Sequence, residues 1–139
     1  MPSSRISSAS GRFWQALALV YLACLSWMLF TPDPWILFGT PGQQLAERFE
    51  STLADHFQHA AAFLLLAILG QLALRGSRGE YWPIRAAWLL GYALATEGSH
   101  ALIPNRYFQW SDLVANLAGV LIGMLLAGFL LQSSPAPDP

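Results

Sequence analysis

Apolar residues form four long runs along this chain, separated by short polar stretches. The first run, 13–30, carries no charged residue and follows Arg5 and Arg12. The others cover residues 56–74, 84–103 and 112–131. An α-helix needs about 20 mostly apolar residues to cross the hydrocarbon core of a bilayer. The pattern therefore predicts an all-α membrane protein with four transmembrane helices.

The stretch between the first two runs has its own pattern. Prolines 32 and 34 end the first helix. From residue 41 to 55, Leu45, Phe49 and Leu53 recur every four residues among charged and amide side chains. This spacing predicts a short amphipathic helix in the first outer loop, lying at the membrane surface.

The remaining connections are short, and the ends of the chain are polar. The loop 104–111 predicts that the last two spans form a tight antiparallel hairpin, with Ser111 or Asp112 as the N-cap of the final helix. The Ser-rich segment 1–12 and the Pro-rich segment 132–139 are predicted to be disordered tails. A single transmembrane domain, 13–131, lies between them.

Composition narrows the class of protein. The chain is 55% hydrophobic and 11% charged, less than half of the roughly 25% charge of soluble domains. The net charge of −1 gives no basic surface for nucleic acid. The single cysteine, Cys24, excludes an internal disulfide. No small-residue cleavage site follows the first run, so we interpret that run as a retained span rather than a signal peptide.

The arginines predict the orientation in the membrane. One side of the predicted topology collects Arg5, Arg12, Arg75, Arg78 and Arg85, and the other side has Arg48 and Arg106. Basic residues favour the cytoplasmic side. Both termini are therefore expected in the cytoplasm, and the loop 104–111 is expected to face outward.

Polar residues gather at the outer ends of three predicted spans. Asp55 and His59 are four residues apart, and so are Asp112 and Asn116, so each pair shares a helix face. Glu97 lies at a similar depth, roughly 5–10 Å below the outer boundary at 1.5 Å per residue. We expect three helices to wall one outward-facing polar pocket. Its predicted residues are Asp55, His59, Glu97, Arg106, Asp112 and Asn116.

Small residues recur at four-residue spacing in the last two runs. The final run has Gly119, Gly123 and Ala127, and the preceding one has a similar stripe around Gly91. Stripes of this kind allow close helix packing in membranes. We therefore predict that Gly91, Gly119 and Gly123 lie at helix contacts.

Ten of these positions match an ordered motif. In chain order they are Asp55, His59, Phe63, Glu97, Pro104, Arg106, Asp112, Asn116, Gly119 and Gly123. The spacing resembles the VanZ-like family of small bacterial membrane proteins over roughly residues 55–125. That family commonly has a basic residue where His56 stands and a glutamine where His100 stands. The resemblance implies the bacterial cytoplasmic (inner) membrane and, through the family's namesake, a link to low-level antibiotic resistance against teicoplanin.

Three hypotheses for the polar residues remain open. The pocket binds a cell-envelope component, such as a lipid headgroup, a peptidoglycan precursor or a glycopeptide, with Arg106 holding a carboxylate or phosphate. Alternatively, it is an intramembrane enzyme for a lipid-linked substrate, with His59 as general acid or base tuned by Asp55 or Glu97. Or the residues are structural, with Glu97, Arg106 and Asp112 closing the hairpin.

Catalytic and metal-binding signals are weak in the sequence. Neither Ser99 nor Ser111 lies in a recognisable nucleophile turn, so catalytic residues are unassigned and binding is favoured over catalysis. No cofactor or metal is expected. The weaker alternative is a zinc site made from His56, His59, Glu97 and His100. The expected partners are membrane lipids and an envelope lipid or glycopeptide ligand, with no nucleic acid, and the oligomeric state is open.

Overall fold

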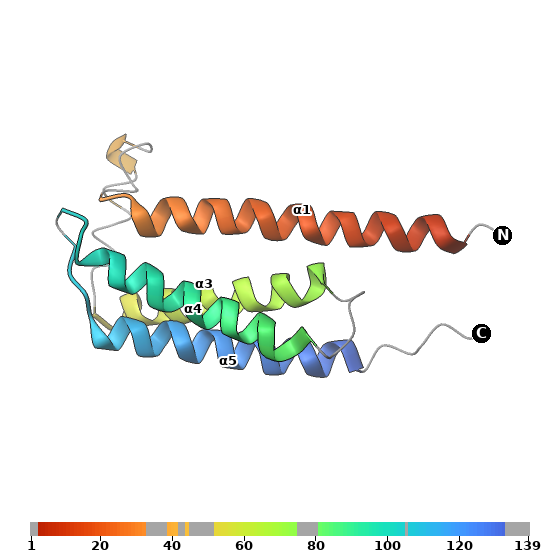
Figure 1. Cartoon of the computed structure of the whole chain (residues 1–139). Coiled ribbons are helices and arrows are strands. Elements are labelled where there is room, and N and C mark those ends of the chain that lie inside the picture. Colours follow the sequence, from red (N-terminus) through yellow and green to blue (C-terminus); the bar gives the residue numbers. More distant parts are fainter. Residues whose placement is uncertain are drawn as a thin grey trace.

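The protein is an antiparallel bundle of four long helices (Figure 1). The computed structural model describes residues 3–32, 39–41, 44, 52–74, 81–104 and 106–132. The helices are α1 (Ser3–Phe30), α3 (Thr52–Ala73), α4 (Trp82–His100) and α5 (Trp110–Gln132). The described residues contain no β-strand, so the expected all-α class is confirmed for this part of the chain.

The helix boundaries differ from the predicted ones at two places. Helix α1 begins at Ser3, so the serine-rich stretch expected to be disordered is helical from that residue onward; no proline interrupts it. Helix α5 begins at Trp110, which places Ser111 and Asp112 in its first turn rather than at its N-cap. Most of the amphipathic helix expected over 41–55 lies outside the described residues, as does the tail 133–139.

Successive helices run in opposite directions along the bundle. Figure 1 shows the last residues of α1 and α4 at the same end as the first residues of α3 and α5. We call this the polar end, defined by Phe30, Thr52, His100 and Trp110. Arg12 and Arg85 lie on the segments at the opposite end. The fold thus separates the described arginines as the orientation argument requires, while the side that faces the cytoplasm stays a prediction.

Three helices are long and apolar enough to cross a membrane: Ser10–Phe30, Asp55–Ala73 and Trp110–Leu131. Helix α4 lacks that hydropathy because Arg85, Glu97 and His100 all lie within its 19 residues. Its buried residues are Ala93, Thr96, Glu97 and His100, one face at three- and four-residue spacing. The described part of the chain therefore has three candidate spans, and a fourth span through α4 stays a prediction.

Helices α3 and α5 make the closest contact in the bundle. A methyl group on Gly119 would overlap the backbone carbonyl of Ala60, and one on Gly123 would lie 2.5 Å from the Leu64 carbonyl oxygen. Only glycine permits this approach. Gly91 differs from the prediction: it is exposed, and a methyl group there meets no neighbouring helix among the described residues. The buried face of α4 is thus not the one that carries Gly91.

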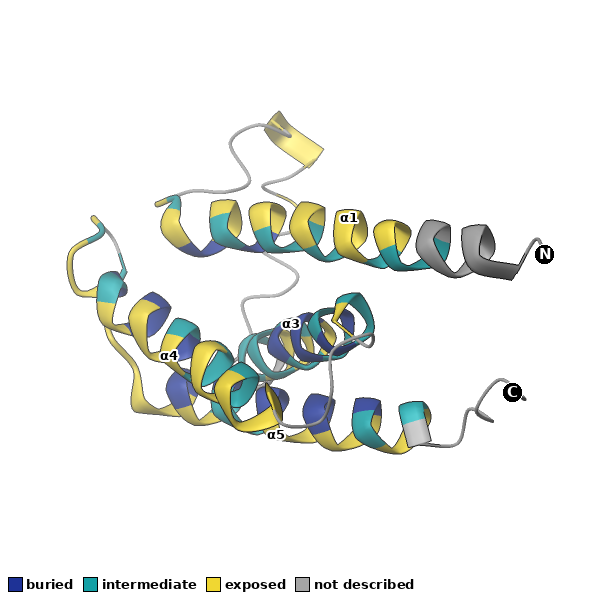
Figure 2. Ribbon diagram, turned by 45° about the vertical axis from the view of Figure 1, so that its right-hand side comes forward, coloured by how far each residue is buried: buried dark blue, intermediate teal, exposed yellow. Residues whose placement is uncertain are grey.

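Helix α1 leaves most of its described surface exposed. Figure 2 shows much of its surface exposed, with buried positions on the side toward the other helices. Leu25 and Leu29 are its buried apolar residues in the described core. Polar contacts also hold it: the Tyr21 hydroxyl donates to the Ala62 carbonyl at 2.9 Å, and Ser26 bonds Tyr92 at 2.8 Å. The exposed apolar side of α1 suits contact with lipid.

Candidate functional site

Two side-chain contacts join α3 to α5 at the polar end. His56 Nδ1 lies 2.9 Å from Asp112 Oδ1, and His59 Nδ1 lies 3.1 Å from Asn116 Oδ1. The two histidines are three residues apart and their partners are four apart, so each pair shares one helix face. Asp112 and Asn116 are buried. These contacts therefore satisfy polar groups that would be costly to leave unpaired away from water.

A second set of distances connects these contacts. His59 Nε2 lies 3.9 Å from Asp55 Oδ1 and 3.9 Å from Asp112 Oδ2. A carboxylate only accepts hydrogen bonds, so His56 Nδ1 carries a hydrogen and donates to Asp112. One imidazole nitrogen of His59 thus faces two carboxylates at ion-pair distance without a hydrogen bond to either. The predicted shared face of Asp55 and His59 is present in the fold.

Glu97 is held inside the bundle. Its side chain is fully buried, and its Oε1 accepts the backbone N–H of Gln109 at 2.8 Å. Its Oε2 lies 3.3 Å from His100 Nδ1, while His100 Nε2 lies 3.1 Å from the Leu29 carbonyl oxygen. That carbonyl only accepts, so Nε2 carries a hydrogen. Glu97 Oε2 is buried and has no hydrogen-bond partner among the described residues.

Arg106 closes the end of α1. Its Nη2 donates to the carbonyls of Met28 at 2.9 Å and Thr31 at 3.0 Å, which satisfies backbone acceptors at a helix C-terminus. Burial lowers the pKa of the Arg106 guanidinium, and the negative charges of Asp55 and Glu97 act in the opposite direction. Among the described residues Arg106 forms no ion pair within 4.0 Å. The hairpin is instead closed by Glu97 on the Gln109 N–H.

Two pockets open at the polar end. One, of about 250 Å³, lies between α1 and α3 and is lined by Tyr21, Cys24, Leu25, Met28, Leu29, Asp55, Gln58, His59, Ala62, Phe63 and Arg106. The other, of about 270 Å³, is lined by Pro32, Asp55, His59, His100, Arg106, Tyr107, Gln109 and Asp112. They share Asp55, His59 and Arg106. The first pocket is amphipathic, whereas the second is mostly polar.

The six predicted pocket residues fall into two groups. Asp55, His59, Arg106 and Asp112 line the pockets. Glu97 and Asn116 are fully buried and hold Gln109 and His59 in place. The sequence prediction missed α1 as a wall, because Tyr21 and Leu25 belong to an apolar run that gave no sign of a site. It also missed Gln109, which takes part through its backbone.

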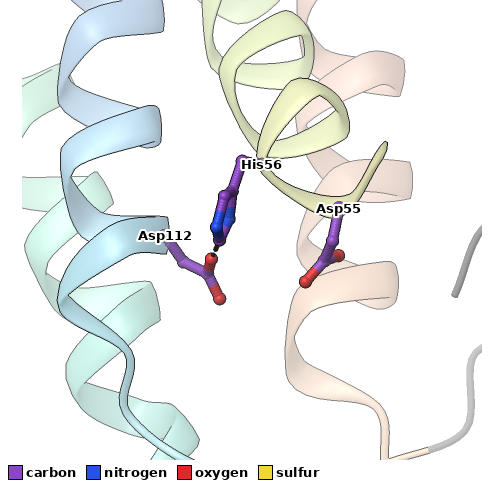
Figure 3. Close-up of side chains that lie close together, drawn as sticks. All are labelled: Asp55, His56 and Asp112. Atoms are coloured by element: carbon purple, nitrogen blue, oxygen red, sulfur yellow. Dashed lines mark hydrogen bonds and ion pairs between the residues drawn. The ribbon is translucent and has the colours of Figure 1, made fainter. Parts of the chain in front are cut away.

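Three ligand-type side chains meet at one point of this site. Figure 3 shows His56 between the carboxylates of Asp55 and Asp112. Their candidate ligand atoms all lie within 4.8 Å of one another. Among the described residues, this group does not include His59, Glu97 or His100, so the weaker sequence alternative of His56, His59, Glu97 and His100 is not the set that the fold assembles.

The sequence model of the VanZ/LLP1 family matches residues 18–131, which extend from α1 to the end of α5. The chain belongs to the VanZ/LLP1 family. Searches of curated proteins and of solved structures found no match. The VanZ/LLP1 match includes every described helix that lines the pockets, and with the apolar helices it indicates a membrane protein.

Proposed function

We propose that this VanZ/LLP1 protein binds an amphiphilic component of the cell envelope at its polar end. The observation that supports this proposal is the sharing of Asp55, His59 and Arg106 by a polar pocket and an amphipathic one. A polar headgroup fits the pocket beside Arg106 and Asp112. An attached hydrocarbon chain fits the apolar wall that Leu25 and Phe63 contribute.

Chemistry narrows the ligand class. The Arg106 guanidinium uses Nη2 on α1, and its Nε is buried without a hydrogen-bond partner in the described part of the chain. Nη1 makes no hydrogen bond with the described residues and is available to a phosphate or carboxylate. Lipid headgroups and lipid-linked peptidoglycan precursors carry such anions next to long hydrocarbon chains, and glycopeptides carry a carboxylate. In the orientation predicted from the arginines, the site faces outward from the bacterial inner membrane. A link to teicoplanin-type resistance then follows from sequestering such a component.

The proposal is tested by lipid binding to purified protein in detergent. Phosphatidylglycerol and an undecaprenyl diphosphate-linked precursor serve as probes, with native mass spectrometry as the readout. We expect Arg106→Gln to weaken binding about tenfold, the typical loss of one charge-assisted contact of about 1.4 kcal/mol. The matched control is Arg12→Gln, which changes an exposed arginine on the opposite segment of α1. Equal binding by both variants would refute the proposed site.

A cellular experiment addresses the link to resistance. Bacteria that express the protein are compared with bacteria that express Arg106→Gln for growth in teicoplanin. Loss of protection at unchanged protein abundance supports ligand binding. A parallel loss of abundance favours the structural alternative, in which these residues only hold the helices together.

An enzymatic role is the second candidate. His59 lies 3.9 Å from the carboxylates of both Asp55 and Asp112, an arrangement suited to a general acid or base. Mass spectrometry of envelope lipids from cells with and without the protein separates the two functions. A changed lipid species that disappears in His59→Gln supports catalysis, whereas an unchanged lipid profile with retained binding supports the binding role.

A further inference from the structure

We propose that Asp55, His56 and His59 of α3, together with Asp112 of α5, form a binding site for a divalent transition-metal ion of the zinc class. The proposal rests on the geometry of these four side chains and does not depend on the envelope ligand. The metal ion would contribute positive charge beside the carboxylates of Asp55 and Asp112.

Three of the four side chains, Asp55, His56 and Asp112, place candidate ligand atoms within 4.8 Å of one another, and His59 lies beside that group. In a tetrahedral zinc site with bonds of about 2.0–2.2 Å, neighbouring ligand atoms lie about 3.3–3.6 Å apart. The pairs here lie on both sides of that range: His56 Nδ1 to Asp112 Oδ1 is 2.9 Å, and His59 Nε2 is 3.9 Å from Asp55 Oδ1 and from Asp112 Oδ2. Asp55, His56 and Asp112 already lie together, so binding of one ion by all four side chains requires a movement of the His59 ring toward this group.

The surroundings orient the ligands as metal sites do. A metal-binding histidine commonly donates its second ring N–H to a fixed acceptor. Asn116, which is fully buried, offers Oδ1 to His59 Nδ1 at 3.1 Å. That contact leaves His59 Nε2 toward Asp55 and Asp112. A buried amide therefore fixes the ring in the orientation that a metal ligand needs.

The Asp112 carboxylate lines the polar pocket with one oxygen that accepts no hydrogen bond within the described part of the chain. Its side chain is only 4% exposed, and Oδ2 accepts no hydrogen bond from the described residues, its nearest partner being His59 Nε2 at 3.9 Å. Oδ2 is not itself buried, so it is open to the polar pocket, where a carboxylate oxygen can coordinate a metal. The pocket beside Asp112 is open to such an ion.

The net charge at the polar end also favours a bound cation. Asp55, Glu97 and Asp112 contribute −3 and Arg106 contributes +1, which leaves −2 when the histidines are neutral. A divalent ion changes the total from −2 to zero, which suits an anionic headgroup better. Two imidazoles and two carboxylates form a mixed nitrogen and oxygen set, which favours zinc or cobalt over magnesium or calcium.

The test uses the full chain in detergent, stripped with a chelator and titrated with Co²⁺, whose visible absorption reports four-coordinate binding. We expect one bound Co²⁺ per chain, displaced by Zn²⁺ and confirmed by elemental analysis. Folded protein that gives no cobalt spectrum and no stoichiometric metal would overturn the proposal. Displacement by Mg²⁺ in place of Zn²⁺ would also contradict it.

Two variants and a control connect any bound metal to this site. Asp55→Asn changes a half-exposed side chain and is expected to weaken Co²⁺ binding at least about tenfold, and Asn116→Ala about 10–100-fold through loss of ring orientation. His100→Gln removes the histidine outside the set and is expected to leave affinity unchanged. Circular dichroism checks the fold of each variant. Unchanged affinity in Asp55→Asn would exclude this site.

The metal and the envelope ligand are separable in the same experiment. Arg106→Gln is expected to retain Co²⁺ binding, because no Arg106 atom belongs to the metal set. Metal binding without lipid binding would leave the metal site standing and refute the proposed function. Lipid binding by metal-free protein that also fails to bind Co²⁺ would support the proposed function and refute the metal site.

Discussion

The close contact of α3 with α5 makes Gly123→Ala a sharp test of the fold. The added methyl group would lie 2.5 Å from the Leu64 carbonyl oxygen and 2.9 Å from Ala67 Cβ. Both neighbours are backbone or attached directly to it, so neither can rotate away. Ordinary contact begins near 3.4 Å, so the two helices must move apart by about 0.9 Å, which is 3.4 minus 2.5.

The net effect is a balance of two terms. Forcing a methyl group into a filled contact costs about 1–3 kcal/mol. Replacing glycine by alanine within a helix returns up to about 1 kcal/mol through helix propensity. We therefore expect a loss of about 1–2 kcal/mol in the free energy of unfolding. Separation of the helices also strains the His59–Asn116 contact, because Asn116 lies two turns earlier on the same face as Gly123.

The assay is reversible unfolding in mixed detergent micelles, followed by circular dichroism as the fraction of dodecyl sulfate rises. Gly128→Ala is the matched control, because it changes the same residue type on the same helix at a position where an added methyl group meets nothing within 4 Å. We expect Gly128→Ala to be neutral or slightly stabilising. Equal stability of the two variants would show that the α3–α5 contact is not the constraint we describe.

Two further predictions concern the buried acid and the topology. Glu97→Gln is expected to change the unfolding free energy by less than about 1 kcal/mol, because the amide accepts from the Gln109 N–H and donates to His100 Nδ1. Glu97→Leu leaves the Gln109 N–H without an acceptor and is expected to cost about 1–3 kcal/mol. Thermal unfolding compares the two variants, and a severe loss in Glu97→Gln would show that the amide does not replace the carboxylate. The topology is tested with single cysteines introduced at positions 40 and 78 in a Cys24→Ser background. Intact cells are treated with a membrane-impermeant thiol reagent, and labelling is expected at position 40 alone. Labelling at position 78 from outside would show that the predicted orientation is wrong.

Much of the fold was predictable because hydrophobic runs of membrane length have few alternatives to a helix. The apolar runs located all four helices, and the four-residue spacing of Asp55 and His59, and of Asp112 and Asn116, placed each pair on one face. Small residues alone were less informative. The stripes around Gly119 and Gly91 look alike in sequence, but only the former lies against a neighbouring helix, because the rotation of each helix depends on its partners.

The sequence by itself determined the class of protein, the helices and the end of the bundle where polar residues gather, since these follow from local hydropathy and spacing. Only the tertiary structure decided which side chains meet. It paired His56 with Asp112, gave Glu97 the backbone of Gln109, and fixed Arg106 on the carbonyls of α1. It also made α1 a wall of the pocket. Such pairings depend on helix register and on backbone groups, which residue types do not encode locally.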